Sequence, residues 1–128
     1  AWSVLLCAFA DAQQRLHLLD LAMGRWDAVP HPPGTFAHFG GYGTHLGIDG
    51  VARVCFQNEA HPTRAVAIAP DGRVSTLLSG GDAPAGPPLR SVRFRSSDGA
   101  SVQGWLATPP GDGPFPTVLH VHGGPHGV

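Results

Sequence analysis

Hydrophobic and polar residues alternate in short runs along the first two thirds of the chain, which is the period-two pattern of β-strands. Turn residues such as Gly, Asp and Pro separate the runs, and Asp49-Gly50 between two of them is a strong hairpin signal. The pattern predicts strands at residues 2–9, 15–21, 25–29, 35–39, 44–48, 51–56, 64–69 and 73–78.

One sequence phrase occurs twice in this part of the chain. RLHLLDLAMGRWDAV at 15–29 and RAVAIAPDGRVSTLL at 64–78 both have the order strand, Gly-Arg turn, strand, and they lie about fifty residues apart. A repeat of that size is typical of the blades of a β-propeller. A β-sandwich with two similar hairpins stays open as the alternative reading.

The pattern changes after residue 88. Expected strands at 91–95 and 101–107 flank the turn Ser96-Ser97-Asp98-Gly99. The segment PTVLHVH at 116–122 is almost continuously apolar apart from its histidines, which predicts a strand buried on both faces, as in an α/β sheet. The Gly-rich loop after it would lie at the carboxyl end of that strand, where open α/β sheets place their ligand sites.

Composition narrows the class further. Gly (18) and Pro (13) make up about a quarter of the 128 residues, which excludes a helical bundle. The formal net charge of −1 gives no sign of a nucleic-acid or membrane partner, and no signal peptide is visible, so a cytoplasmic location is expected. Cys7 and Cys55 lie in apolar runs without C-x-x-C spacing, which favours buried free thiols over a disulfide or a zinc site.

The loop HGGPH at 122–126 carries the strongest chemical signal. A backbone N–H from a loop of this type forms half of the oxyanion hole in α/β-hydrolases, and glycine lets the peptide approach a substrate carbonyl closely. Pro125 has no N–H, so Gly123, Gly124 and His126 are the available donors. One preorganised donor of this kind is worth roughly 3 to 4 kcal/mol in the transition state of acyl transfer.

Residues 94–127 together resemble the entry into the catalytic domain of the prolyl oligopeptidase family of serine peptidases. The matching parts are Ser-x-Asp-Gly at 96–99, Gly104-Trp105-Leu106 with Pro109 after it, Pro116 before the apolar run, and HGGPH. The resemblance implies a mostly β chain: the C-terminal part of a β-propeller at 1–88, then the N-terminal strands of an α/β-hydrolase sheet at 89–128.

The resemblance also implies roles for individual residues. A His at position 122 is similar to the acylaminoacyl-peptidase branch, because prolyl oligopeptidase proper and the dipeptidyl peptidase IV branch have Tyr there. Gly124 would donate its N–H to the oxyanion and His122 would orient the loop. The catalytic Ser, Asp and His would lie beyond Val128, since no serine of the chain stands in a G-x-S-x-G turn, and this piece alone would be inactive.

The implied activity is hydrolysis of short peptides or acylated amino acids, with no cofactor and no metal. The implied partners are short peptide substrates and the remainder of the parent chain, without nucleic acid or membrane. The oligomeric state stays open, a homo-oligomer included.

Several plainer readings stand beside these. His120, His122 and His126 have a spacing that could suit zinc, but the chain offers no carboxylate or cysteine after them, and His120 is expected to be a core histidine. Trp26 and Trp105 are expected to pack in a core rather than to bind substrate. The alternative to a serine peptidase is a non-catalytic propeller or sandwich module that binds other proteins. In that case HGGPH is only a tight turn.

Overall fold

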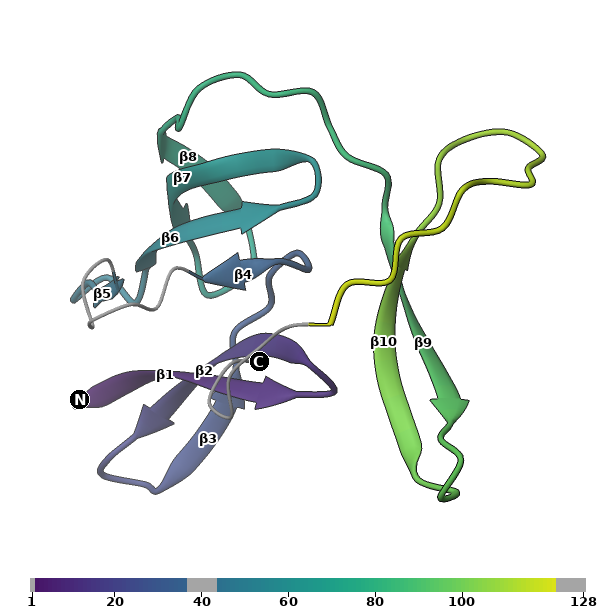
Figure 1. Cartoon of the computed structure of the whole chain (residues 1–128). Helices are drawn as coiled ribbons and strands as arrows, with labels where there is room; N and C mark the ends of the chain where they lie inside the picture. Colours follow the sequence, from purple (N-terminus) through teal and green to yellow (C-terminus); the bar gives the residue numbers. More distant parts are fainter. Residues whose placement is uncertain (1, 37–43, 122–128) are drawn as a thin grey trace. The chain divides into compact units, whose positions relative to one another are not determined.

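The computed structural model describes residues 2–36 and 44–121. These residues form ten β-strands and no helix (Figure 1). They belong to two compact units, Ala1–Gly86 and Pro87–Val128. The first unit contains two antiparallel sheets, and the second contains a single hairpin.

The first sheet has the order β1-β2-β3, formed by β1 (Ser3–Ala10), β2 (Gln13–Asp20) and β3 (Arg25–Ala28). Only Asp11 and Ala12 separate β1 from β2, and both have positive φ, at 51° and 55°. Two left-handed residues in a two-residue loop are the mark of a type I′ turn, whose twist matches that of the strands. Asp tolerates this conformation better than Ala does, because an alanine Cβ crowds the backbone there.

The second sheet has the order β4-β6-β7-β8, with β5 also paired to β6. Alternate residues of its two long strands point into the core, which is the pattern that the sequence predicts for half-buried strands. The bounds are β4 (Thr35–Phe36), β5 (Thr44–Leu46), β6 (Ala52–Asn58), β7 (His61–Ile68) and β8 (Val74–Leu78).

One buried cluster joins the two sheets. It combines Leu16 and Val29 from the first part of the chain with residues of the second sheet. Phe56 of the second sheet is the largest fully buried side chain of the cluster, at 1% exposed. His31 links the parts as well: its Nε2 accepts a hydrogen bond from the Leu16 N–H at 3.2 Å, and its Nδ1 donates to the Pro32 carbonyl at 2.8 Å. The Gln14 side chain accepts a further bond from the Phe36 N–H. The cluster consists of Leu16, Val29, Phe36, Ala52, Val54, Phe56, Val66 and Ile68.

Three of the hairpins use the same five-residue turn, with Asp at the third position and Gly at the fourth. In each, the Asp Oδ1 accepts a hydrogen bond from the N–H two residues later, at 3.0 to 3.1 Å, and the Gly has positive φ, at 74°, 85° and 85°. Two backbone bonds close each turn, at 2.8 to 3.0 Å. The three turns are residues 47–51 between β5 and β6, 69–73 between β7 and β8, and 96–100 in the second unit.

The second unit is built on the antiparallel hairpin of β9 (Leu89–Arg95) and β10 (Ser101–Ala107), with Arg95 opposite Ser101. Residues 108–121 follow without regular secondary structure. Trp105 on β10 is 40% exposed, because a two-stranded hairpin has no second layer within this unit to cover it.

The structure corrects four expectations. Residues 116–121 do not form the predicted buried strand: Val118 is 90% exposed, since no strand among the described residues pairs with this segment. His120 is therefore exposed rather than a core residue.

Trp26 and Trp105 are not core residues either, and Trp26 lies on the surface beside His17, with ring centroids 4.6 Å apart. Cys7 and Cys55 are free thiols, but only half-buried.

The turn between β1 and β2 gives a stability prediction. Ala12→Gly removes the left-handed strain of an alanine at φ 55° and should raise the free energy of unfolding by about 1 kcal/mol. Ala10→Gly, in the neighbouring strand, is the matched control and should lower it by about 0.5 to 1 kcal/mol. Urea unfolding of both variants measures this, and a loss of stability in Ala12→Gly would contradict the type I′ turn.

The turn at 47–51 gives a pH prediction. Arg53 donates to the Asp49 carboxylate at 2.9 and 3.3 Å, and this hydrogen-bonded pair, helped by the Val51 N–H, lowers the pKa of Asp49 from 3.8 to about 2. A lowered pKa means that the pair stabilises the folded protein above pH 3.8 and that this contribution is lost as the pH falls towards 2.

A carboxyl-carbon NMR titration should therefore give Asp49 a midpoint near pH 2. Arg53→Gln should move that midpoint upward, because it removes the main cause of the shift, whereas Arg73→Gln in the next hairpin should leave it unchanged. An unmoved midpoint in Arg53→Gln would refute the pairing.

Candidate functional site

The strongest catalytic candidates of the sequence, His122 and Gly124, lie outside the described residues. The described segment before them, 108–121, contains two glycines with positive φ, Gly111 at 117° and Gly113 at 59°. The half-buried Phe115 side chain lies over these glycines, within 3.5 to 4.0 Å of where their Cβ atoms would be. Another residue at either position would be strained by the positive φ, whereas its Cβ would lie at ordinary contact distance from the Phe115 ring.

The motif Ser96-Ser97-Asp98-Gly99 has a local structural role. Asp98 accepts a hydrogen bond from the Ala100 N–H at 3.0 Å, and this bond, together with one from the Ser96 hydroxyl, lowers the pKa of the Asp98 carboxyl. The Arg95 guanidinium also donates to the Gly99 carbonyl, at 3.1 Å. Asp98 is therefore an ionised carboxylate held in a turn, which does not suit a general acid.

The described histidines and carboxylates do not form a metal centre. No group of three His, Cys, Asp or Glu side chains that could hold an ion occurs within residues 2–36 and 44–121. Of the three histidines whose spacing could suit zinc, His120 is described and exposed, and His122 and His126 lie outside the described part. Within the same ranges no helix is long and apolar enough to cross a membrane.

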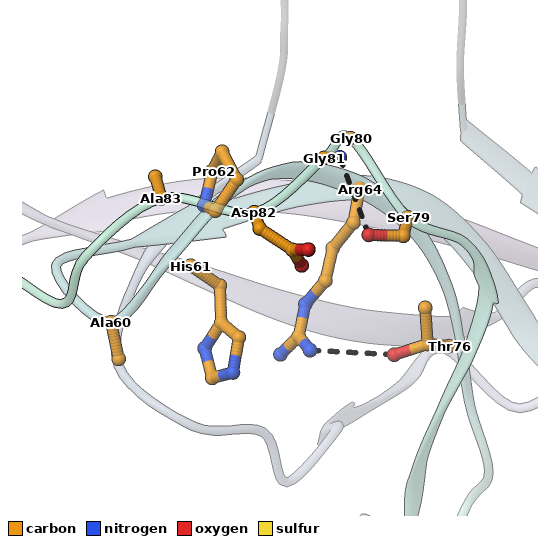
Figure 2. A pocket seen from close by; sticks show the side chains of 10 residues that line it. All are labelled: Ala60, His61, Pro62, Arg64, Thr76, Ser79, Gly80, Gly81, Asp82 and Ala83. Carbon is orange, nitrogen blue, oxygen red and sulfur yellow. Dashed lines mark hydrogen bonds between the residues drawn. The ribbon is translucent and has the colours of Figure 1, made fainter.

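A polar pocket lies in the first unit, between β7, β8 and the loop that follows β8 (Figure 2). Its volume is about 180 Å³, and Arg64, His61, Asp82 and Thr76 are among the residues that line it. In Figure 2 the side chains of Arg64, His61 and Asp82 extend into the same space. The pocket thus contains a guanidinium, an imidazole and a carboxylate from two separate parts of the chain.

The loop after β8 reaches the pocket because it runs back along β7. A Cβ at Gly80 would collide with the Thr63 carbonyl, so only glycine allows this approach. Further along, the Gly86 N–H donates to the Glu59 carbonyl at 2.7 Å. These two contacts hold the intervening residues, Asp82 included, beside the first half of β7.

Arg64 is fixed at the base of the pocket. Its Nη1 donates to Thr76 Oγ1 at 3.3 Å, and its guanidinium carbon lies 5.9 Å from the centre of the Phe56 ring. Its Nε is buried and has no hydrogen-bond acceptor among the described residues. His61 is oriented by a 3.2 Å hydrogen bond from its Nδ1 to Asn58 Oδ1, which leaves Nε2 for another partner.

Sequence reasoning did not find this pocket. Arg64 stood out only as the first residue of a repeated phrase, His61 had no assigned role, and Asp82 lay in a stretch rich in Gly, Ala and Pro. No spacing links the three residues, because the loop after β8 must first return along β7 before Asp82 meets Arg64. The pocket follows from the folded path of the loop and not from any local sequence pattern.

Comparison with known proteins gives one short likeness. No family model matches the chain, and no solved structure matches it. A curated protein named Esterase FrsA, from Enterobacter sp. (strain 638), is 58% identical to the chain over 31 residues. The matched stretch is 24% of this chain and only 8% of the esterase's length. This likeness supports a hydrolase, and no finer class.

Proposed function

We propose that the protein is a serine hydrolase of the prolyl oligopeptidase type, which cleaves short peptides or acylated amino acids through an acyl-enzyme. The observation that carries the proposal is the 58% identity over 31 residues to an esterase. Ester and peptide hydrolysis by a serine nucleophile share a tetrahedral oxyanion, so one kind of site serves both. In this proposal residues 1–88 end a β-propeller and residues 89–128 begin the α/β-hydrolase domain, in a cytoplasmic protein without a cofactor.

The proposed role of this chain in the reaction is oxyanion stabilisation. Gly124 donates its backbone N–H to the substrate oxygen as that oxygen gains negative charge, and His122 orients the loop. The absence of a side chain at Gly124 lets the peptide approach the reacting carbonyl.

The nucleophile of the proposed mechanism is a serine outside this chain. The described serines support this, because several of them have structural hydrogen bonds. Ser79 accepts from the Gly81 N–H and Ser91 from the Gln103 amide, both at 3.3 Å, and Ser96 bonds to Asp98. None of these bonds pairs a serine with a histidine, which a serine nucleophile requires.

A second candidate is a non-catalytic module that binds other proteins. The exposed apolar side chains of the first unit favour it, since Trp2 is 82% and Met23 79% exposed. The two proposals differ in what they expect of the HGGPH loop, which is catalytic in one and only a turn in the other.

The test is steady-state kinetics of the full-length protein on an acylated amino-acid anilide and on a short-chain nitrophenyl ester. Gly124→Val should lower kcat by about 100-fold or more with little change in KM, because the lost donor acts in the transition state. His122→Ala should lower kcat less, because its effect on the oxyanion is indirect.

Gly104→Ala is the control, since a Cβ at Gly104 would meet Phe94 and Val92 at an ordinary contact distance of 3.7 Å. Its kinetics should stay close to those of the natural protein. Unchanged kcat in both loop variants would remove the oxyanion role, and absence of any hydrolysis would favour the protein-binding module.

A further inference from the structure

Opposite charges line the Arg64 pocket without bonding to each other. Arg64 and Asp82 extend into the same space (Figure 2), yet no ion pair or hydrogen bond joins them. Other charged residues of the first unit do pair, as at Arg25–Asp27, Asp49–Arg53 and Asp71–Arg73. The pocket therefore offers a positive group and a negative group to a third partner.

The Arg64 guanidinium is held in a position from which it can donate hydrogen bonds to a ligand. Thr76 holds Nη1 and the Phe56 ring lies beneath the group, so Arg64 has a defined position before any ligand arrives. Its Nε is buried without an acceptor among the described residues, which leaves Nη1 and Nη2 as the guanidinium nitrogens that a ligand in the pocket can reach. A carboxylate fits best, because its two oxygens match the parallel N–H groups along one edge of a guanidinium.

The other wall of the pocket favours a positively charged group. The Asp82 carboxylate accepts hydrogen bonds, and Nε2 of His61 can accept one as well when Nδ1 carries the ring proton that bonds to Asn58 Oδ1. A dianion such as phosphate would meet Arg64 but would be repelled by Asp82. A molecule with a carboxylate and an ammonium group close together meets both.

The pocket is small and half open to solvent. The volume of about 180 Å³ is below the roughly 300 to 1,000 Å³ of pockets for drug-sized ligands. We propose that the pocket between β7, β8 and the loop after β8 binds a free α-amino acid with a small side chain. The amino-acid carboxylate binds Arg64, and its ammonium group binds Asp82 and His61.

Isothermal titration calorimetry of the full-length protein with glycine and L-alanine tests the proposal. Acetate and methylamine serve as probes with one charge each, and inorganic phosphate as the dianion. Glycine and alanine should bind at least about tenfold more tightly than any of the three, because each probe lacks one of the two charge-assisted contacts.

Two variants locate the binding. Arg64→Gln and Asp82→Asn should each weaken amino-acid binding by about tenfold or more. Arg73→Gln, in the turn of the same hairpin, and Asp112→Asn, in the other unit, are exposed matched controls and should leave it unchanged. Asp82 lies on a loop and is exposed, so its variant keeps the test valid if Arg64→Gln unfolds the protein.

Three results would overturn the proposal. The first is no heat of binding for glycine or alanine at millimolar concentration. The second is binding that Asp82→Asn leaves unchanged, which would place the amino acid at another site, such as the centre of the proposed hydrolase. The third is phosphate or acetate binding as tightly as glycine, which would make the pocket a plain anion site.

Discussion

The hydrogen bond that an aspartate Oδ1 accepts from the backbone N–H two residues later fixes the strand register of one hairpin in each unit and of a further hairpin in the first. It occurs at Asp49, Asp71 and Asp98, each time followed by a glycine with positive φ. Each turn places specific residues opposite each other, as Ile68 lies opposite Val74 across β7 and β8. A shift by one residue would turn Val66 and Ile68, now 0% and 1% exposed, from the core to solvent.

The same turn explains what sequence reasoning could reach. Asp-Gly between alternating runs predicts a hairpin from local chemistry, and the strands joined by the three turns lie close to their expected positions. The strand predicted at 116–121 was wrong. A continuous apolar segment forms a strand only where neighbouring strands pair with it, and the sequence pattern does not show whether such strands are present. Trp26 and Trp105 were predicted to be buried because tryptophan is apolar, but residue type does not show whether another sheet or helix covers that face of the strand.

The turn also changes the weight of the family resemblance. Ser-x-Asp-Gly at 96–99 is one of three copies of a turn that the first unit uses twice, so it reflects hairpin chemistry more than a particular family. The hydrolase assignment depends mainly on the HGGPH loop and on the short stretch shared with an esterase. The loop could be proposed from the sequence because its chemistry is encoded in consecutive residues, and it lies outside the described residues. The Arg64 pocket was not, because Arg64 and Asp82 meet only after β8 and its loop have folded back along β7.

Reaction of the full-length protein with a fluorophosphonate, read by intact mass and peptide mapping, tests the central claim most directly. A serine hydrolase forms one covalent adduct per chain, on a serine activated by a neighbouring histidine. The account predicts such an adduct on a serine in a G-x-S-x-G turn outside residues 1–128, with loss of any hydrolytic activity. A folded full-length protein that gains no adduct, or gains one on a serine within residues 1–128, would contradict it.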